Sequence, residues 1–161
     1  TPTDEEGLRW LRETRPDADP ELLQDVYAIT GHKPISAQAL FDSEQVAQRL
    51  AMVAALTEWL KGYCGPIETA KKLAAKEMPS LPYELLYRAA ASAQRQQVLP
   101  QANRRGVFQA LIDELAGRWS TKALSRLAEA CGKARSLSGA SNNLNAELSL
   151  EHFLMTQQKP V

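Results

Sequence analysis

Cysteine and histidine are scarce in this sequence, which holds two of each: Cys64, Cys131, His32 and His152. Structural zinc sites use about four such ligands, arranged in close pairs. The two cysteines are far apart in the chain and form no CxxC pair. We therefore expect no metal and no cofactor, and we expect reduced, buried thiols in preference to a disulfide.

Glycine is limited to eight residues, and none of them builds a phosphate-binding loop. Neither G-x-x-x-x-G-K-[ST] nor a G-x-G-x-x-G following a strand is present. We expect neither histidine to act as a catalytic base, and the pair Asp113-Glu114 fits a solvated helix face. We expect no catalytic centre and no small-molecule substrate. The alternative is an all-α enzyme built around His32 or His152 from residues distant in sequence.

Long apolar runs are also missing. No run approaches the roughly 18 residues of a membrane-spanning helix, and no basic segment followed by an apolar one opens the chain. These absences predict a cytoplasmic protein that makes no membrane contact. The chain starts at Thr1 without methionine, so we expect a piece of a longer protein or a processed one.

Aromatic residues make up 6% of the chain, whereas apolar residues make up 44% and include 24 alanines. Alanine, leucine, glutamine, glutamate, lysine and arginine dominate, and they lose little side-chain entropy in a helix. Strand-forming β-branched residues are few. The composition predicts an all-α fold, which we divide into a small three-helix unit at 1–42 and a bundle of five or six helices at 44–161.

Local signals mark the helix ends. Thr3, with Glu6 three residues later, has the capping-box pattern that starts a helix. Asp19 followed by Pro20 is typical of a cap and a first helical residue, and Gly31 is typical of a helix end.

The remaining helices follow from apolar spacing and from breaks. We expect a helix at 36–41, a longer one between residue 43 and Gly62, a lysine-rich one reaching residue 77, one at 82–97, a loop at 98–105, a helix at 107–117, a helix capped by Ser120, a loop at 138–143, and a final helix capped by Asn145. Residues 144–150 alternate as a strand would, but their residue types favour a helix.

Charge is uneven although the net charge is zero. Residues 1–43 carry nine acidic and four basic side chains, whereas residues 44–161 carry ten acidic and fifteen basic ones. We interpret this uneven charge as two helical units with different solvent-exposed surfaces. The alternative is that the basic part of the chain faces nucleic acid. Few aromatics lie between the basic residues, which argues against a groove that stacks single strands.

Five residues are candidates for contact with a partner or with DNA: Arg88, Arg95, Arg104, Arg105 and Trp119. Arg88 and Arg95 are seven residues apart on one helix and so share a face. All three tryptophans, Trp10, Trp59 and Trp119, lie by apolar stripes and are expected in the core. An exposed tryptophan would instead be a strong interface anchor.

Two segments resemble a known family. The run Gly31-His32-Lys33-Pro34-Ile35-Ser36-Ala37-Gln38-Ala39-Leu40, with Trp10-Leu11 and Leu22-Leu23 before it, resembles the helical lid of bacterial clamp loaders. The run is similar to the corresponding pattern in the delta-prime subunit of DNA polymerase III. The pattern Asn145, Glu147, Leu148, Leu150, Phe153 and Leu154 is similar to the end of the collar domain of that subunit.

The resemblance implies a lid at 1–42 and a collar at 44–161 that assembles with the clamp-loader gamma/tau and delta subunits in DNA replication. It also implies an ATPase-like domain preceding this sequence. Pro34 stands where hydrolysing relatives carry a phosphate-sensing arginine, which implies a scaffold and not an enzyme. A divergent gamma/tau or delta subunit has the same architecture. A helical nucleic-acid-binding module that uses the basic residues of 44–161 for weak DNA contact is the alternative function.

Overall fold

The structure, a computed structural model, describes residues 3–74, 78–99, 105–138 and 143–157. Within these ranges the regular elements are all α-helices, which confirms the all-α expectation. They are α1 (Asp4–Thr14), α2 (Pro20–Ile29), α3 (Pro34–Asp42), α4 (Val46–Leu60), α5 (Pro66–Leu73), α6 (Leu81–Val98), α7 (Val107–Arg118), α8 (Thr121–Ser138) and α9 (Asn143–Gln157).

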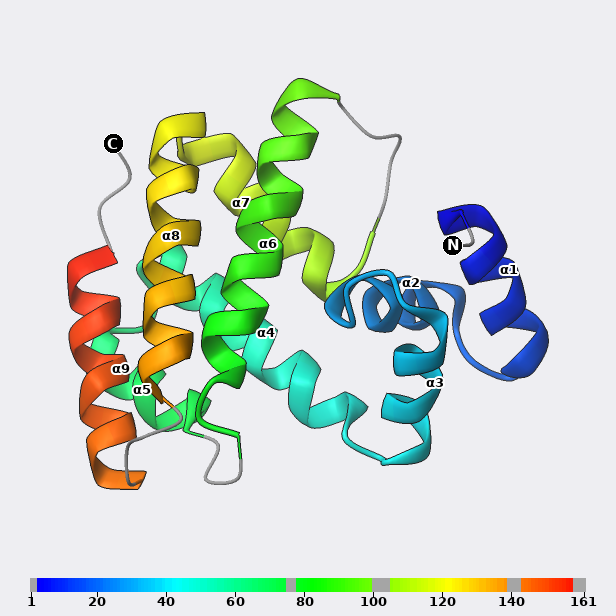
Figure 1. The fold of residues 1–161 in the computed structure, drawn as a ribbon, viewed down its shortest axis with the longest axis horizontal. Coiled ribbons are helices and arrows are strands. Elements are labelled where there is room, and N and C mark those ends of the chain that lie inside the picture. Colours follow the sequence, from blue (N-terminus) through cyan, green and yellow to red (C-terminus); the bar gives the residue numbers. More distant parts are fainter. Residues whose placement is uncertain (1–2, 75–77, 100–104, 139–142, 158–161) are drawn as a thin grey trace.

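The helices form two groups along the long axis of the molecule (Figure 1). We call α1–α3 the three-helix unit and α4–α9 the bundle. In the bundle, α6 packs against α7 and α8, α4 packs against α7, and α5 packs against α9. Helix α2 also packs against α7, so the three-helix unit is joined to the bundle by a helix contact as well as by the chain.

The first helix ends are those that the sequence predicts. The Thr3 hydroxyl accepts from the Glu6 amide at 3.2 Å, and the Thr3 amide donates to the Glu6 carboxylate at 2.9 Å, which completes the capping box. The Asp19 carboxylate accepts from the Glu21 amide at 3.2 Å, with Pro20 as the first helical residue. Both caps satisfy amides that lack partners within the helix.

Gly31 lies one residue beyond the C-cap of α2, which is Thr30. The Gly31 amide donates to the Ala28 carbonyl at 3.1 Å and the His32 amide donates to the Tyr27 carbonyl at 2.9 Å. These two bonds form a Schellman motif. Gly31 has a φ of 76°, the left-handed conformation that this position requires and that glycine adopts at no steric cost.

Several boundaries differ from expectation. Helix α3 starts at Pro34, two residues early, because the fixed φ of proline suits a first helical position. Helix α5 ends at Leu73 and not near residue 77; Ala74 is extended, and 75–77 lie outside the described residues. Helix α8 continues through Ser138, where a loop was expected. Helix α9 already includes Asn143, so Asn145 lies inside it and its assignment as the cap is wrong.

Each group of helices has its own hydrophobic cluster. The smaller cluster fills the three-helix unit with Leu11, Leu23, Val26, Tyr27 and Ala37. The larger cluster fills the bundle, and its largest buried members include Trp59, Phe108, Leu111, Leu115, Leu124 and Leu127. Ile29 of α2 belongs to the bundle cluster, and Leu40 packs against both clusters. Apolar burial therefore also holds the two groups together.

The tryptophans divide between core and surface. Trp59 is fully buried and Trp119 is 6% exposed, which confirms the expected core positions. Trp10 is 42% exposed, so the expectation is wrong there. Helix α1 buries its Gly7 and Leu11 face, and Trp10 precedes Leu11 by about 100° of helical rotation.

Cys64 and Cys131 are both free and buried, as expected. Burial raises the pKa of the Cys131 thiol to about 12, so it stays protonated and unreactive at neutral pH. None of the described helices combines the length and hydrophobicity needed to cross a membrane.

Candidate functional site

Asp25 connects the three-helix unit to the bundle. It lies in α2 and is 5% exposed. One carboxylate oxygen accepts from the Val107 amide at 2.9 Å, and the other accepts from the Phe108 amide at 3.0 Å. These are the first amides of α7, whose N-cap residue Gly106 has no side chain to satisfy them. A side chain about 80 residues earlier in the chain therefore caps α7.

The surroundings of Asp25 have opposing effects on the pKa of its carboxyl group. Burial raises the pKa of Asp25 and is the largest influence, the two amides lower it in part, and the charge of Glu21 raises it. The net result is a pKa above the ordinary value of 3.8. The carboxylate that caps α7 is therefore buried, and its two hydrogen bonds from amides only partly offset the cost of burying its charge.

Arg88 of α6 makes a second polar contact across the junction. Its guanidinium donates a hydrogen bond to the Ile29 carbonyl at the end of α2. Carbonyls in the last turn of a helix lack partners within the helix, and arginine is well suited to supply one. The guanidinium also lies beside Gly31, where an added β-carbon would be 3.6 Å from Nε. Arg88 therefore serves the junction and has less freedom to contact a partner.

A cavity of about 390 Å³ lies at the junction between the three-helix unit and the bundle. The lining residues come from α1, α2, the turn after α2, α6 and the start of α7; those of interest are Asp4, Gln24, Tyr27, His32, Ser92, Arg95, Arg105 and Phe108. Polar and charged residues from both groups of helices thus line one partly open cavity, and Arg95 and Arg105 on it are exposed to solvent.

On the side of the three-helix unit, Asp4, Tyr27 and His32 form a cluster. The Asp4 carboxylate lies 3.5 Å from His32 Nδ1. The Tyr27 and His32 rings meet edge to face with centroids 5.2 Å apart. The pKa of Tyr27 is raised, first by burial and then by the charge of Asp4. The cluster ties the start of α1 to the turn after α2, where His32 has a φ of 61°.

The structure brings together two of the four candidate arginines. Arg95 and Arg105 line the same cavity, whereas Arg88 lines a second cavity of about 280 Å³ between α3 and α6. Arg104 lies outside the described residues. The shared face expected for Arg88 and Arg95 therefore does not give them a shared cavity.

Trp119, the fifth candidate, belongs to the core of the bundle. Its carbonyl accepts a hydrogen bond from the Gln97 amide group at 2.7 Å, which ties the end of α7 to α6. With 6% of its surface exposed, Trp119 offers a partner little contact area. Trp10 has the exposure that an interface anchor needs.

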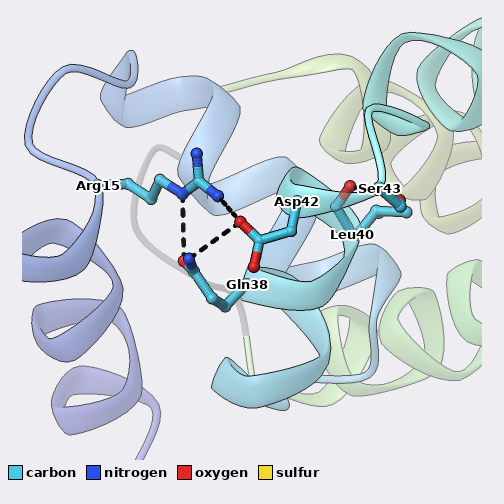
Figure 2. Close-up of polar contacts among 5 residues, drawn as sticks. All are labelled: Arg15, Gln38, Leu40, Asp42 and Ser43. Carbon is cyan, nitrogen blue, oxygen red and sulfur yellow. Dashed lines mark hydrogen bonds and ion pairs between the residues drawn. The ribbon is translucent and has the colours of Figure 1, made fainter.

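Arg15 joins α1 to α3 within the three-helix unit (Figure 2). Its guanidinium donates to Gln38 Oε1 at 3.2 Å and pairs with the Asp42 carboxylate. The same guanidinium lies over the Phe41 ring, 5.3 Å from the centroid. The Ser43 hydroxyl donates to the Leu40 carbonyl at 2.8 Å and so ends α3. These contacts stabilise the corner from which the chain enters α4.

Asp25, which makes two hydrogen bonds across the junction, is not among the residues predicted from the sequence. Two signals were available: Asp25 stands between Leu23 and Val26 on an apolar stripe, and Gly106 precedes α7 without a local cap. Neither signal identifies the other, because only the tertiary fold brings them together. Within the described ranges no group of three or more His, Cys, Asp or Glu residues is arranged to hold a metal ion.

Comparisons with known proteins identify no relative. No protein-family model matches the chain, and neither the curated proteins nor the solved structures include a significant match.

Proposed function

We propose that this chain is a non-catalytic scaffold of a bacterial clamp loader, corresponding to the lid and collar of the delta-prime subunit of DNA polymerase III. In this role it assembles with the gamma/tau and delta subunits through residues 44–161 and so helps to load the sliding clamp. The proposal rests on fold-level and motif-level analogy.

The position of the run 31–40 carries the proposal. Gly31 makes the Schellman turn, Pro34 starts α3, and Ala37 is fully buried in the three-helix unit. Leu40 packs against both hydrophobic clusters. The residues that carry the resemblance thus shape the corner between the three-helix unit and the bundle, as expected of a lid that leads into a collar.

The surface of α9 supports assembly through the bundle. Leu150, Phe153 and Leu154 are buried, whereas Leu148 is 53% exposed and Met155 is 62% exposed. Leu148 and Met155 are seven residues apart and lie on one side of the helix. Two large apolar side chains on one exposed helix face suit a helix-to-helix contact with another subunit.

Copurification tests the proposal. The full chain, mixed with purified gamma/tau and delta subunits from the same organism, is expected to elute with them in size-exclusion chromatography. Elution of the chain by itself at micromolar concentration would reject the scaffold role. Tight binding to DNA that falls steeply with salt would favour the alternative, a nucleic-acid-binding module.

A further inference from the structure

The cavity between the three-helix unit and the bundle has the size of a small-ligand site. Its volume is about 390 Å³, within the range of roughly 300–1,000 Å³ that ligand pockets occupy. Its lining includes the apolar residues Leu8, Phe108 and Ile112 as well as charged and polar ones. The two walls belong to different helix groups, so an occupant would contact both.

The wall formed by the bundle carries two arginines, Arg95 and Arg105. The Arg95 guanidinium donates to the Ser92 hydroxyl at 3.2 Å, a neutral acceptor on its own helix. Neither arginine forms an ion pair with another residue of the described ranges. Two guanidinium groups on one cavity repel each other and favour an anion between or beside them.

The acidic groups of the cavity already have partners. Both Asp25 oxygens accept amides of α7. Asp4 lies beside His32 and Tyr27. An occupant therefore meets positive charge on the bundle wall and, on the other wall, the remaining acceptor positions of Asp4. A molecule that suits both walls has an anionic end and hydrogen-bond donors at its other end.

We propose that this cavity binds a small phosphate ester that bears hydroxyl groups, with its phosphate held by Arg95 and Arg105. A phosphate monoester is close to dianionic at neutral pH and presents three acceptor oxygens, which matches two guanidinium groups. A carboxylate has one charge and two oxygens, which a single arginine satisfies. The hydroxyl groups of the ligand donate to Asp4, and Gln24 and Ser92 provide neutral polar contacts. This inference does not depend on the proposed scaffold role.

Calorimetric titration of the full chain with ribose 5-phosphate tests the proposal. Saturable binding is expected, with inorganic phosphate as a competitor and ribose as an inactive control. Arg95→Gln and Arg105→Gln should each weaken binding by about tenfold, since each removes charge-assisted hydrogen bonds. Arg126→Gln is the matched control, because Arg126 lies on α8 outside the cavity lining and should leave binding unchanged.

The same titration gives clear contrary results. No saturation up to about 10 mM ribose 5-phosphate would overturn the proposal. Equal affinity in the parent, Arg95→Gln and Arg105→Gln proteins, with unchanged helical circular dichroism, would also overturn it. A single-stranded oligonucleotide that binds through the two arginines, while ribose 5-phosphate does not, would assign them to nucleic acid instead.

Discussion

Gly106 lies against the carboxylate of Asp25 so closely that a β-carbon on Gly106 would be 2.4 Å from Oδ1. Gly106 also has a φ of 138°, a conformation that side chains of L-residues rarely adopt. The glycine thus lets α2 approach the start of α7 and lets one carboxylate cap two amides. The contact makes the junction between the two helix groups a specific one.

Gly106→Ala is expected to destabilise the protein by at least about 2 kcal/mol, because it adds backbone strain and displaces the capping carboxylate. Gly117→Ala is the matched control within α7, where an added β-carbon meets no atom within 4 Å. It should stabilise the protein by about 0.5–1 kcal/mol through helix propensity. Urea unfolding measures both. Similar effects of the two substitutions would contradict the described junction.

Asp25→Asn should change the pH dependence of stability. Burial raises the pKa of Asp25 in the folded protein above its ordinary value of 3.8. A raised pKa means that the folded state binds the proton more tightly, so the contribution of this carboxyl group to stability is greatest below pH 3.8 and declines as pH rises through the folded pKa. The stability advantage of the parent over Asp25→Asn should therefore grow from pH 7 to pH 4.

Urea unfolding of the parent and Asp25→Asn at both pH values measures that difference. The other carboxyl groups are common to the two proteins and largely cancel. A stability difference that shrinks toward pH 4 would mean that the amide contacts, and not burial, control the pKa of Asp25.

The sequence predicted the fold class and most helices, because their signals are local. The capping box at Thr3 and the cap at Asp19 depend on residues within one helical turn, and both are present. The sequence did not predict the features that depend on contacts between distant parts of the chain. Helix α7 takes its cap from Asp25, and Trp10 turns outward because Gly7 and Leu11 occupy the buried face of α1.

The candidate site was only partly predictable for the same reason. Arg95 was identified from its place on a helix, but its shared cavity with Arg105, Asp4 and His32 depends on how α2 packs against α7. The sequence indicates Arg88 only as a candidate for partner or DNA contact, because nothing local shows that the Ile29 carbonyl accepts its hydrogen bond.

Alanine substitutions of a buried and an exposed leucine of α9 should have very different effects on the free energy of unfolding. Leu154 is fully buried, so Leu154→Ala should cost about 2–5 kcal/mol through lost burial and a residual cavity. Leu148 is 53% exposed, so Leu148→Ala should stay within about 0.5 kcal/mol of the parent. Thermal and urea unfolding check both values. A large loss for Leu148→Ala would place that side chain in the core and remove it from the proposed assembly face.

The chain should not bind ATP, since it lacks a phosphate loop and has Pro34 at the position implied for a phosphate-sensing arginine. Titration with a fluorescent ATP analogue measures this directly. Saturable binding with a Kd of about 10 μM or tighter that ribose 5-phosphate does not displace would contradict a scaffold without a nucleotide site of its own.

Assembly with clamp-loader subunits tests the central proposal most directly. The full chain is the right reagent, because cutting it after residue 43 would remove the Asp25 cap of α7. We predict that the parent chain elutes with purified gamma/tau and delta subunits. The double substitution Leu148→Asp and Met155→Asp should abolish this co-elution. Leu137→Asp, which changes an exposed leucine on α8, is the control and should preserve it. Failure of the folded parent chain to elute with these subunits would contradict the account.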